Sequence, residues 1–149
     1  MSGNNVTLEL KNKLSELKKL HQHVEQFGAS LGLSRETIFH LNLVLEELVT
    51  NVISYGYTDE AEHLIRITLS EDNGTIHLCL EDDGIPFNPI RAKKPDLDTP
   101  VEGRQIGKVG IHFCKELMKN LKYERREGKN IISMKKEIKK KDDTRAESR

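Results

Sequence analysis

The feature that most constrains the fold is a pair of strand-like segments joined by a tight turn. Residues 64–70 and 75–81 are rich in β-branched and aliphatic side chains, and Glu71-Asp72-Asn73-Gly74 separates them. Asn-Gly is favoured in two-residue hairpin turns because both residues tolerate positive φ. The sequence therefore predicts an antiparallel hairpin, and such a hairpin needs further strands or helices to cover its apolar face.

Further segments with strand or helix patterns supply that cover. Residues 122–127 and 130–138 read as a second hairpin around Gly128-Lys129, and residues 6–10 read as a short edge strand. Three segments show helical periodicity instead: residues 13–31, a segment from the N-cap Ser34 to about Tyr55, and residues 111–121. The first helix is expected to end near Gly28 or Gly32, and the second at Gly56. The apolar stripe of the first helix consists of Leu14, Leu17, Leu20, Val24, Phe27 and Leu31.

The order of these segments predicts the fold class. Adjacent strands favour hairpins, so we expect an α+β two-layer sandwich with a mixed, mostly antiparallel sheet and the helices on one face. The 149 residues suit a single domain. We expect that domain to span residues 1–138, followed by a charged, flexible tail over residues 139–149.

Composition and charge exclude several classes of protein. Lys plus Arg (24) balance Asp plus Glu (24), so no net positive charge favours nucleic acid. No apolar run is long enough to span a bilayer, and the N-terminal residues lack the pattern of a secretion signal. Cys79 and Cys114 lie in apolar patterns without metal-binding spacing, so we expect reduced, buried thiols in a cytoplasmic protein. His77 shares a strand face with Cys79, but no second pair completes a zinc site.

The second helix carries two polar residues beside its apolar face. In VLEELVTN (44–51), Glu47 and Asn51 are four residues apart and therefore lie on one stripe of the helix. They fit a solvated helix flank. They also fit a site, because a carboxylate and an amide oxygen suit Mg²⁺ binding and proton acceptance. Glu46 points about 100° away, so it is the better candidate for plain solvation.

A sharp turn follows the strand at residues 75–81. In EDDGIPF (81–87), Asp82 leaves the strand, Gly84 follows two residues later and Pro86 comes two residues after that. Asp82 fits an ordinary turn residue. A carboxylate at a strand end can also accept a hydrogen bond from a base amine, and Gly84 would let a flat ring approach the backbone.

A glycine-rich segment precedes the third helix. GRQIGKVGIHF (103–113) contains Gly103, Gly107 and Gly110, with Arg104 and Lys108 between them. Backbone N–H groups at a helix N-terminus bind anions, although glycine-rich loops are also common without a phosphate. Residues 82–109 contain all four prolines and little periodicity, which is typical of a functional or disordered loop.

Together, these three segments resemble the motifs of the histidine-kinase-like ATPases, the Bergerat-fold or GHKL superfamily. ELVTN (47–51) resembles the N box of this superfamily, DDGIPF (82–87) its first glycine box and GKVGIHF (107–113) its second. Within the superfamily, the chain is most similar to the RsbW-type anti-sigma factor serine/threonine kinases. The resemblance covers roughly residues 6–138.

The resemblance implies a role for each matching residue. Glu47 corresponds to the carboxylate that deprotonates the attacking hydroxyl, and Asn51 to the residue that gives an oxygen to a single Mg²⁺ ion. Asp82 corresponds to the aspartate that receives the adenine amino group, with Gly84 beneath the ring.

The second glycine box of the chain departs from the family pattern. Gly110 and Gly107 correspond to glycines that wrap the phosphates of ATP. Lys108 occupies the position of the first glycine of a Gly-x-Gly pair, and Gly107 comes one residue early, so either Lys108 contacts phosphate or the lid closes differently. A late-strand Thr or Ser often touches the adenine region in the family, and here Asn130 and Ser133 are the candidates.

The implied function is an ATP- and Mg²⁺-dependent serine/threonine kinase that acts on a protein. Its substrate would be an anti-sigma factor antagonist (a STAS protein), its alternative partner a sigma factor, and it would form a homodimer, as is common in the group. The alternative is a nucleotide-gated binding module without useful phosphotransfer. The altered second glycine box favours this module, whereas the presence of Glu47 and Asn51 argues against it. A simple ATPase or a detached histidine-kinase domain fits the motifs less well.

Overall fold

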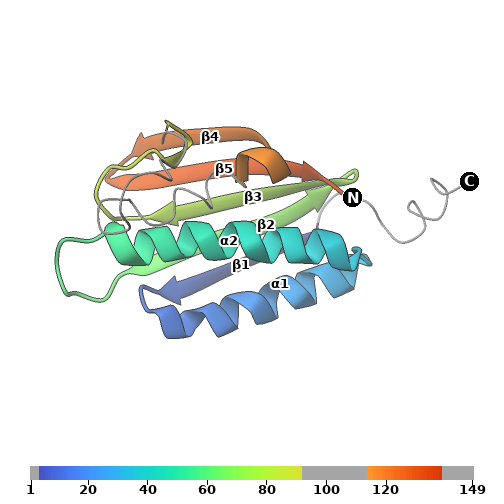
Figure 1. The fold of residues 1–149 in the computed structure, drawn as a ribbon, viewed down its shortest axis with the longest axis horizontal. Coiled ribbons are helices and arrows are strands. Elements are labelled where there is room, and N and C mark those ends of the chain that lie inside the picture. Colours follow the sequence, from blue (N-terminus) through green and yellow to red (C-terminus); the bar gives the residue numbers. More distant parts are fainter. Residues whose placement is uncertain (1–3, 92–113, 139–149) are drawn as a thin grey trace, which may run out of the picture.

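A computed structural model describes residues 4–91 and 114–138 of the chain. Figure 1 shows a five-stranded sheet whose strands follow the order β1-β2-β3-β5-β4. All four neighbouring pairs are antiparallel. The strands are β1 (Asn4–Lys11), β2 (Leu64–Asp72), β3 (Thr75–Asp82), β4 (Lys119–Arg126) and β5 (Lys129–Glu137). The predicted α+β class is therefore confirmed, and the sheet is antiparallel rather than mixed.

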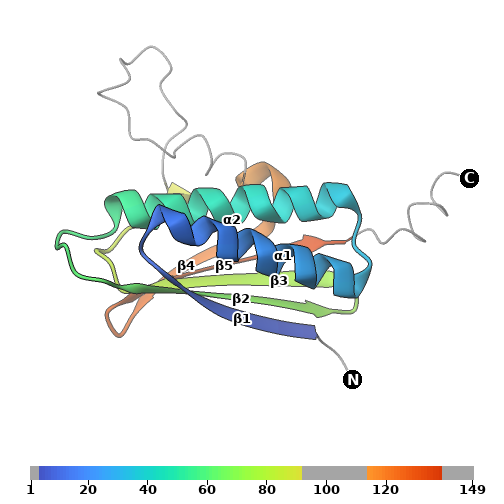
Figure 2. The ribbon, with the colours of Figure 1, turned by 90° about the horizontal axis from the view of Figure 1, so that it is seen from below.

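Helices α1 (Leu17–Leu31) and α2 (Arg35–Tyr55) cover one face of this sheet (Figure 2). The core lies between the two layers, because alternate strand residues point toward the helices. Ile65, Ile67 and Leu69 of β2, for example, are fully buried. The opposite face of the sheet carries mostly polar side chains, as expected for an antiparallel sheet with one solvated face. Among the described helices, none is both long and apolar enough to cross a membrane.

Both predicted hairpins form around left-handed turn residues. Asn73 and Gly74 have φ values of 51° and 83°, which matches the turn type that Asn-Gly favours. The second turn is centred on Glu127 (φ 52°) and Gly128 (φ 77°), one residue earlier than predicted. The earlier centre arises because Lys129 already pairs with Arg126 in the β4–β5 ladder.

The first helix begins later than its periodicity suggests. A short 3₁₀ helix (Leu14–Glu16) precedes α1, and Leu14 is 57% exposed, so its assignment to the apolar stripe was wrong. The helix ends at Gly32, whose φ of 67° is the left-handed cap that glycine adopts without strain. Gly28 stays inside the helix, where an added Cβ would lie 2.5 Å from the side chain of Ile38 on α2.

The bounds of α2 agree with those predicted. Ser34 caps its N-terminus by accepting a hydrogen bond from the Thr37 backbone N–H at 3.1 Å. At the other end, the Gly56 N–H donates to the Val52 carbonyl at 2.8 Å. The helix is therefore capped at both ends, and the segment after Gly56 leads into β2.

The predicted third helix (residues 111–121) is wrong at its C-terminal end. Residues 114–117 are helical, and the Met118 N–H still bonds to the Cys114 carbonyl at 2.9 Å. From Lys119 onward the chain is a strand, and Asn120 has a left-handed φ of 56°. Pairing with β5 overrides the local helical spacing here, because a strand satisfies the backbone of this edge of the sheet.

Candidate functional site

Helix α2 presents Glu47 and Asn51 on one stripe, as their spacing predicts. Both side chains are half-buried at the border of the apolar face, whereas Val44 on the same side is fully buried. Within the described residues, neither makes a hydrogen bond or an ion pair. Two half-buried polar side chains that are unused by the fold are available to a ligand.

The neighbours of Glu47 shape its chemistry. Burial, with the adjacent charge of Glu46 as a second cause, raises the pKa of the Glu47 carboxyl. Glu46 is turned toward α1, where its carboxylate lies 3.0 Å from Nε2 of His21. Burial, with the charge of Glu47 as a second cause, raises the pKa of Cys114 to about 12, so this nearby thiol stays protonated at neutral pH.

Asp82 is a buried carboxylate at the end of β3. It is 5% exposed, and its Oδ1 accepts hydrogen bonds from the Gly84 N–H at 2.9 Å and from the Asn130 Nδ2 at 3.0 Å. No described residue donates to Oδ2. Burial raises the pKa of Asp82, and this effect outweighs the two hydrogen bonds, which lower it. The fold thus leaves Asp82 Oδ2 without a donor among the described residues, and an adenine amino group is the kind of donor that this oxygen could accept from.

The surroundings of Asp82 also fit a flat, apolar ring. Ile85 and Phe87 in the same turn are 42% and 45% exposed, although both are large apolar side chains. Apolar surface beside a few fixed polar groups is typical of sites for small molecules. The turn after β3 therefore combines exposed apolar side chains with the fixed carboxylate of Asp82.

The turn after β3 is attached directly to the end of α2. The Ile85 N–H donates to the Gly56 carbonyl at 2.7 Å, and an added Cβ on Gly84 would lie 2.3 Å from that same oxygen. Gly56 follows Asn51 by five residues, about 7.5 Å along a helix axis. The end of α2 that carries Asn51 thus adjoins the turn that carries Asp82. Glycine is needed at position 84 for this contact, before any ligand is considered.

We expect Gly84→Ala to weaken both the fold and the site. The Cβ would meet a backbone carbonyl that has little room to move, which costs about 1–3 kcal/mol of unfolding free energy. Denaturant unfolding and nucleotide titration measure the two effects. Gly74→Ala is the matched control: its positive φ also strains alanine, but it lies at the opposite end of the sheet, so nucleotide affinity should remain unchanged. Unaltered affinity in Gly84→Ala would contradict a ligand at this turn.

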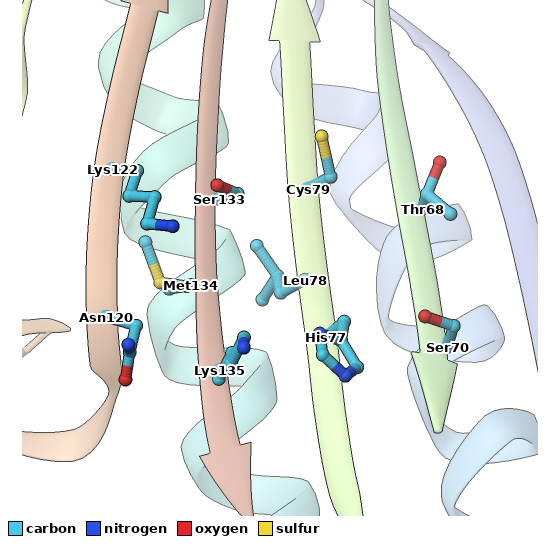
Figure 3. Close-up of a pocket in the computed structure, with 10 residues that line it drawn as sticks. All are labelled: Thr68, Ser70, His77, Leu78, Cys79, Asn120, Lys122, Ser133, Met134 and Lys135. Atoms are coloured by element: carbon cyan, nitrogen blue, oxygen red, sulfur yellow. The ribbon is translucent and has the colours of Figure 1, made fainter. Parts of the chain in front are cut away.

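Of the two late-strand candidates, only Asn130 lies at the turn. It pairs with Asp82 in the β3–β5 register, its Nδ2 also donates to the Ile85 carbonyl at 2.8 Å, and its Oδ1 accepts from the Phe87 N–H at 3.3 Å. Ser133 pairs with Cys79 and lies on the face of the sheet opposite the helices (Figure 3). Its assignment to the adenine region is therefore wrong, because strand residues an odd number apart point to opposite faces.

Two further residues of β4 support the turn, and the sequence reasoning missed them. Arg125 donates from Nη1 to the Gly84 carbonyl at 2.8 Å, and the Tyr123 hydroxyl donates to Asn130 Oδ1. Their alternation along a strand is the only signal that could have placed them on the same side. Because both act on groups that contact Asp82, they help to hold its carboxylate in place.

The outer face of the sheet carries a separate, shallow depression of about 150 Å³ (Figure 3). One row of paired residues crosses four strands here: Thr68, Cys79, Ser133 and Lys122. His77 shares this face with Cys79, as predicted. Within residues 4–91 and 114–138, no three or more His, Cys, Asp or Glu side chains are grouped as a metal site would require. The depression lies away from Asp82 and Glu47 and has no acid–base pair.

The glycine-rich segment lies outside the described residues. Gly107, Lys108 and Gly110, the predicted phosphate-binding residues, therefore stay predictions from the sequence. The described part of the candidate site comprises the stripe of Glu47 and Asn51 and the turn with Asp82 and Gly84.

Comparison with known proteins places the chain among nucleotide-binding domains. The family model described as a histidine kinase-like ATPase domain matches residues 10–136. Serine/threonine-protein kinase BtrW from Bordetella bronchiseptica is 26% identical over 90% of this chain and 94% of its own length. The anti-sigma F factor of Clostridium novyi is 28% identical, over 93% and 98%.

A solved structure shares the fold. The crystal structure of the RsbU and RsbW domains of a Mycobacterium tuberculosis protein matches with a TM-score of 0.63 at 12% sequence identity. The match covers 91% of this chain and 32% of that longer one. At this identity, the likeness supports the arrangement of sheet and helices alone.

Proposed function

Because the chain belongs to the histidine kinase-like ATPase family, we propose that it is an ATP-dependent serine/threonine kinase and anti-sigma factor. Its substrate in this proposal is an anti-sigma factor antagonist of the STAS class, and phosphorylation of that antagonist frees the kinase to bind a sigma factor. The names of the two relatives, a serine/threonine kinase and an anti-sigma factor, support both halves. A homodimer in the cytoplasm, with a nucleotide-binding domain over residues 1–138, completes the proposal.

The observation that carries this proposal is the pairing of a buried, incompletely satisfied carboxylate with two unused polar side chains. Asp82 offers Oδ2 to the base amine, while its Oδ1 is held by the Gly84 N–H and Asn130 Nδ2. On helix α2, Asn51 would hold Mg²⁺ through its amide oxygen. The ion, when bound, supplies positive charge for the phosphate oxygens, which carry the charge that develops in phosphoryl transfer.

Glu47 is the proposed general base. As the serine oxygen forms its bond to the γ-phosphorus and the bond to the ADP oxygen breaks, the Glu47 carboxylate accepts the hydroxyl proton. The raised pKa of Glu47 makes its carboxylate a stronger base than one in water. Gly107, Lys108 and Gly110 are the proposed phosphate-binding residues, with backbone N–H groups and one ammonium as donors.

The test is transfer of a labelled γ-phosphoryl group from ATP to a candidate antagonist. We expect label on a serine of the STAS partner only when Mg²⁺ is present, and capture of a sigma factor by the kinase once the antagonist has been phosphorylated. Binding of ATP without label on any partner would instead favour the nucleotide-gated binding module. Failure to bind adenine nucleotides at all would reject both functions.

A further inference from the structure

His63 occupies a junction between three segments near the candidate site. It immediately precedes β2, and its backbone is held by Asn12 at the end of β1. The Asn12 N–H donates to the His63 carbonyl at 3.1 Å, and the His63 N–H donates to Asn12 Oδ1 at 2.9 Å. These two hydrogen bonds fix the backbone of His63 and therefore the position from which its imidazole extends.

The imidazole of His63 connects two acidic residues from different segments. Its Nε2 lies 2.7 Å from Oδ1 of Asp59, in the segment between α2 and β2. Its Nδ1 lies 3.1 and 3.2 Å from the two carboxylate oxygens of Asp83, which sits between Asp82 and Gly84. The ring of Tyr57 stacks on it at 4.1 Å with an interplanar angle of 13°, and the His63 side chain is only 16% exposed.

This arrangement defines the charge of the ring. Ionised carboxylates only accept hydrogen bonds, so both ring nitrogens must donate, and only the imidazolium form has two N–H groups. The hydrogen bond to Asp59, followed by that to Asp83, raises the pKa of His63. The charged groups that act on the ring are the carboxylates of Asp59 and Asp83, and no basic side chain of the described residues is among the causes of its raised pKa.

The bridge acts on the same turn that the end of α2 contacts. Asp83 and Gly84 are adjacent, and the Gly84 N–H is one of the two donors to Asp82 Oδ1. Movement of Asp83 would therefore displace the donor that orients the Asp82 carboxylate. The hydrogen bond between Gly56 and Ile85 holds the turn after Gly84, and the contact between His63 and Asp83 holds it before Gly84.

We propose that His63, in its protonated form, is a positioning residue for the nucleotide site: it clamps the segment carrying Asp59 to the turn carrying Asp83, and so orients Asp82 toward the base. This inference rests on the proposed nucleotide-binding function. It predicts that nucleotide affinity depends on pH through a residue that does not touch the nucleotide.

The direction of the pH dependence follows from the raised pKa. The contribution of His63 is complete below the ordinary histidine pKa of about 6.5 and is lost as pH rises through the higher pKa of the folded protein. Above that pKa, the neutral ring has one N–H, so one carboxylate loses its donor. Nucleotide affinity and stability both fall as a result.

The experiment compares ATP dissociation constants of the full chain and its His63→Gln variant from pH 5.5 to 9. Glutamine can still donate to one carboxylate but carries no charge. The terminal phosphate of ATP also titrates in this range. The readout is therefore the dissociation constant of His63→Gln divided by that of the wild type at each pH, because the phosphate titration cancels in this ratio. We expect His63→Gln to bind about tenfold more weakly at low pH and nearly equally at high pH, a coupling of ordinary size.

Two further variants separate positioning from plain structural damage. Asp83→Asn removes one of the charges that stabilise the imidazolium, so the midpoint of the pH dependence should shift to lower pH. His77→Gln, on the outer face of the sheet, is the matched control and should follow the wild-type curve throughout. Thermal unfolding of each variant at each pH verifies that the protein is folded during titration.

The outcomes distinguish failure of the His63 clamp from failure of the proposed nucleotide-binding function. ATP binding with a constant ratio between wild type and His63→Gln, or an unmoved midpoint in Asp83→Asn, would overturn the clamp and leave the nucleotide site intact. A wild-type protein that binds no adenine nucleotide at any pH would overturn both. A ratio that falls with pH, together with a shifted midpoint in Asp83→Asn, would support the clamp.

Discussion

Replacement of Glu47 with Gln should lower the rate of phosphotransfer by about 10²–10⁴-fold, the usual contribution of a general base. Glutamine preserves the size of the side chain but cannot accept the hydroxyl proton. Because Glu47 makes no hydrogen bond or ion pair among the described residues, the fold should not depend on its charge. ATP affinity should therefore change little. Single-turnover transfer of labelled phosphate to the antagonist measures the rate, and calorimetry measures the affinity.

Glu46→Gln is the matched control for this variant. The two residues are neighbours on α2, but Glu46 faces His21 of α1 and is 42% exposed. Its replacement should remove a surface contact with His21, which contributes little to stability, and the smaller of the two causes that raise the pKa of Glu47, so phosphotransfer should stay near the wild-type rate. Equal losses in both variants would point to a general effect of charge on α2 rather than to a base at position 47.

Replacement of Asp82 with Asn should weaken ATP binding by about 10- to 100-fold, because a buried donor would be left facing another donor. The amide oxygen can still accept from the Gly84 N–H and Asn130 Nδ2, so the turn should keep its shape. The amide nitrogen, however, would replace Oδ2 and oppose the adenine amino group. Inosine triphosphate carries a carbonyl at that position, so the variant should lose much less affinity for it, and the preference between the two nucleotides should shift.

The ratio of ATP to inosine triphosphate affinity is the decisive measurement for Asp82. Asp72→Asn, at the opposite end of β2, provides a control with the same chemical change far from the site. A parallel loss for both nucleotides in Asp82→Asn would mean that the carboxylate supports the turn without reading the base. A changed ratio in Asp72→Asn would indicate a nonspecific effect of the substitution.

Local chemistry made much of the fold predictable. The positive φ values at Asn73 and Gly74 follow from the preferences of those two residue types, and the Ser34 cap follows from its hydroxyl. The stripe of Glu47 and Asn51 follows from helix geometry alone. Each of these features depends on residues close together in the chain.

Features that depend on strand register were not predictable. Asn130 reaches Asp82 because β3 and β5 pair in one particular register, although β4 lies between them in the sequence. The same uncertainty left Ser133 as an alternative, and a one-residue difference in register would have exchanged their faces. The hydrogen bonds of His63 to Asp59 and Asp83 likewise join residues whose proximity no short-range pattern reveals.

The hydrogen bond between the Gly56 carbonyl and the Ile85 N–H has a consequence for how nucleotides are told apart. It attaches the turn that carries Asp82 to the C-terminal end of α2, so in the proposed site the part that would hold the purine is tied to the helix. ADP and ATP carry the same purine, so contacts to the purine would contribute equally to the affinity for both nucleotides. Discrimination between ADP and ATP would then depend on the part of the proposed site that binds the phosphates, to which we assign Asn51 and Glu47.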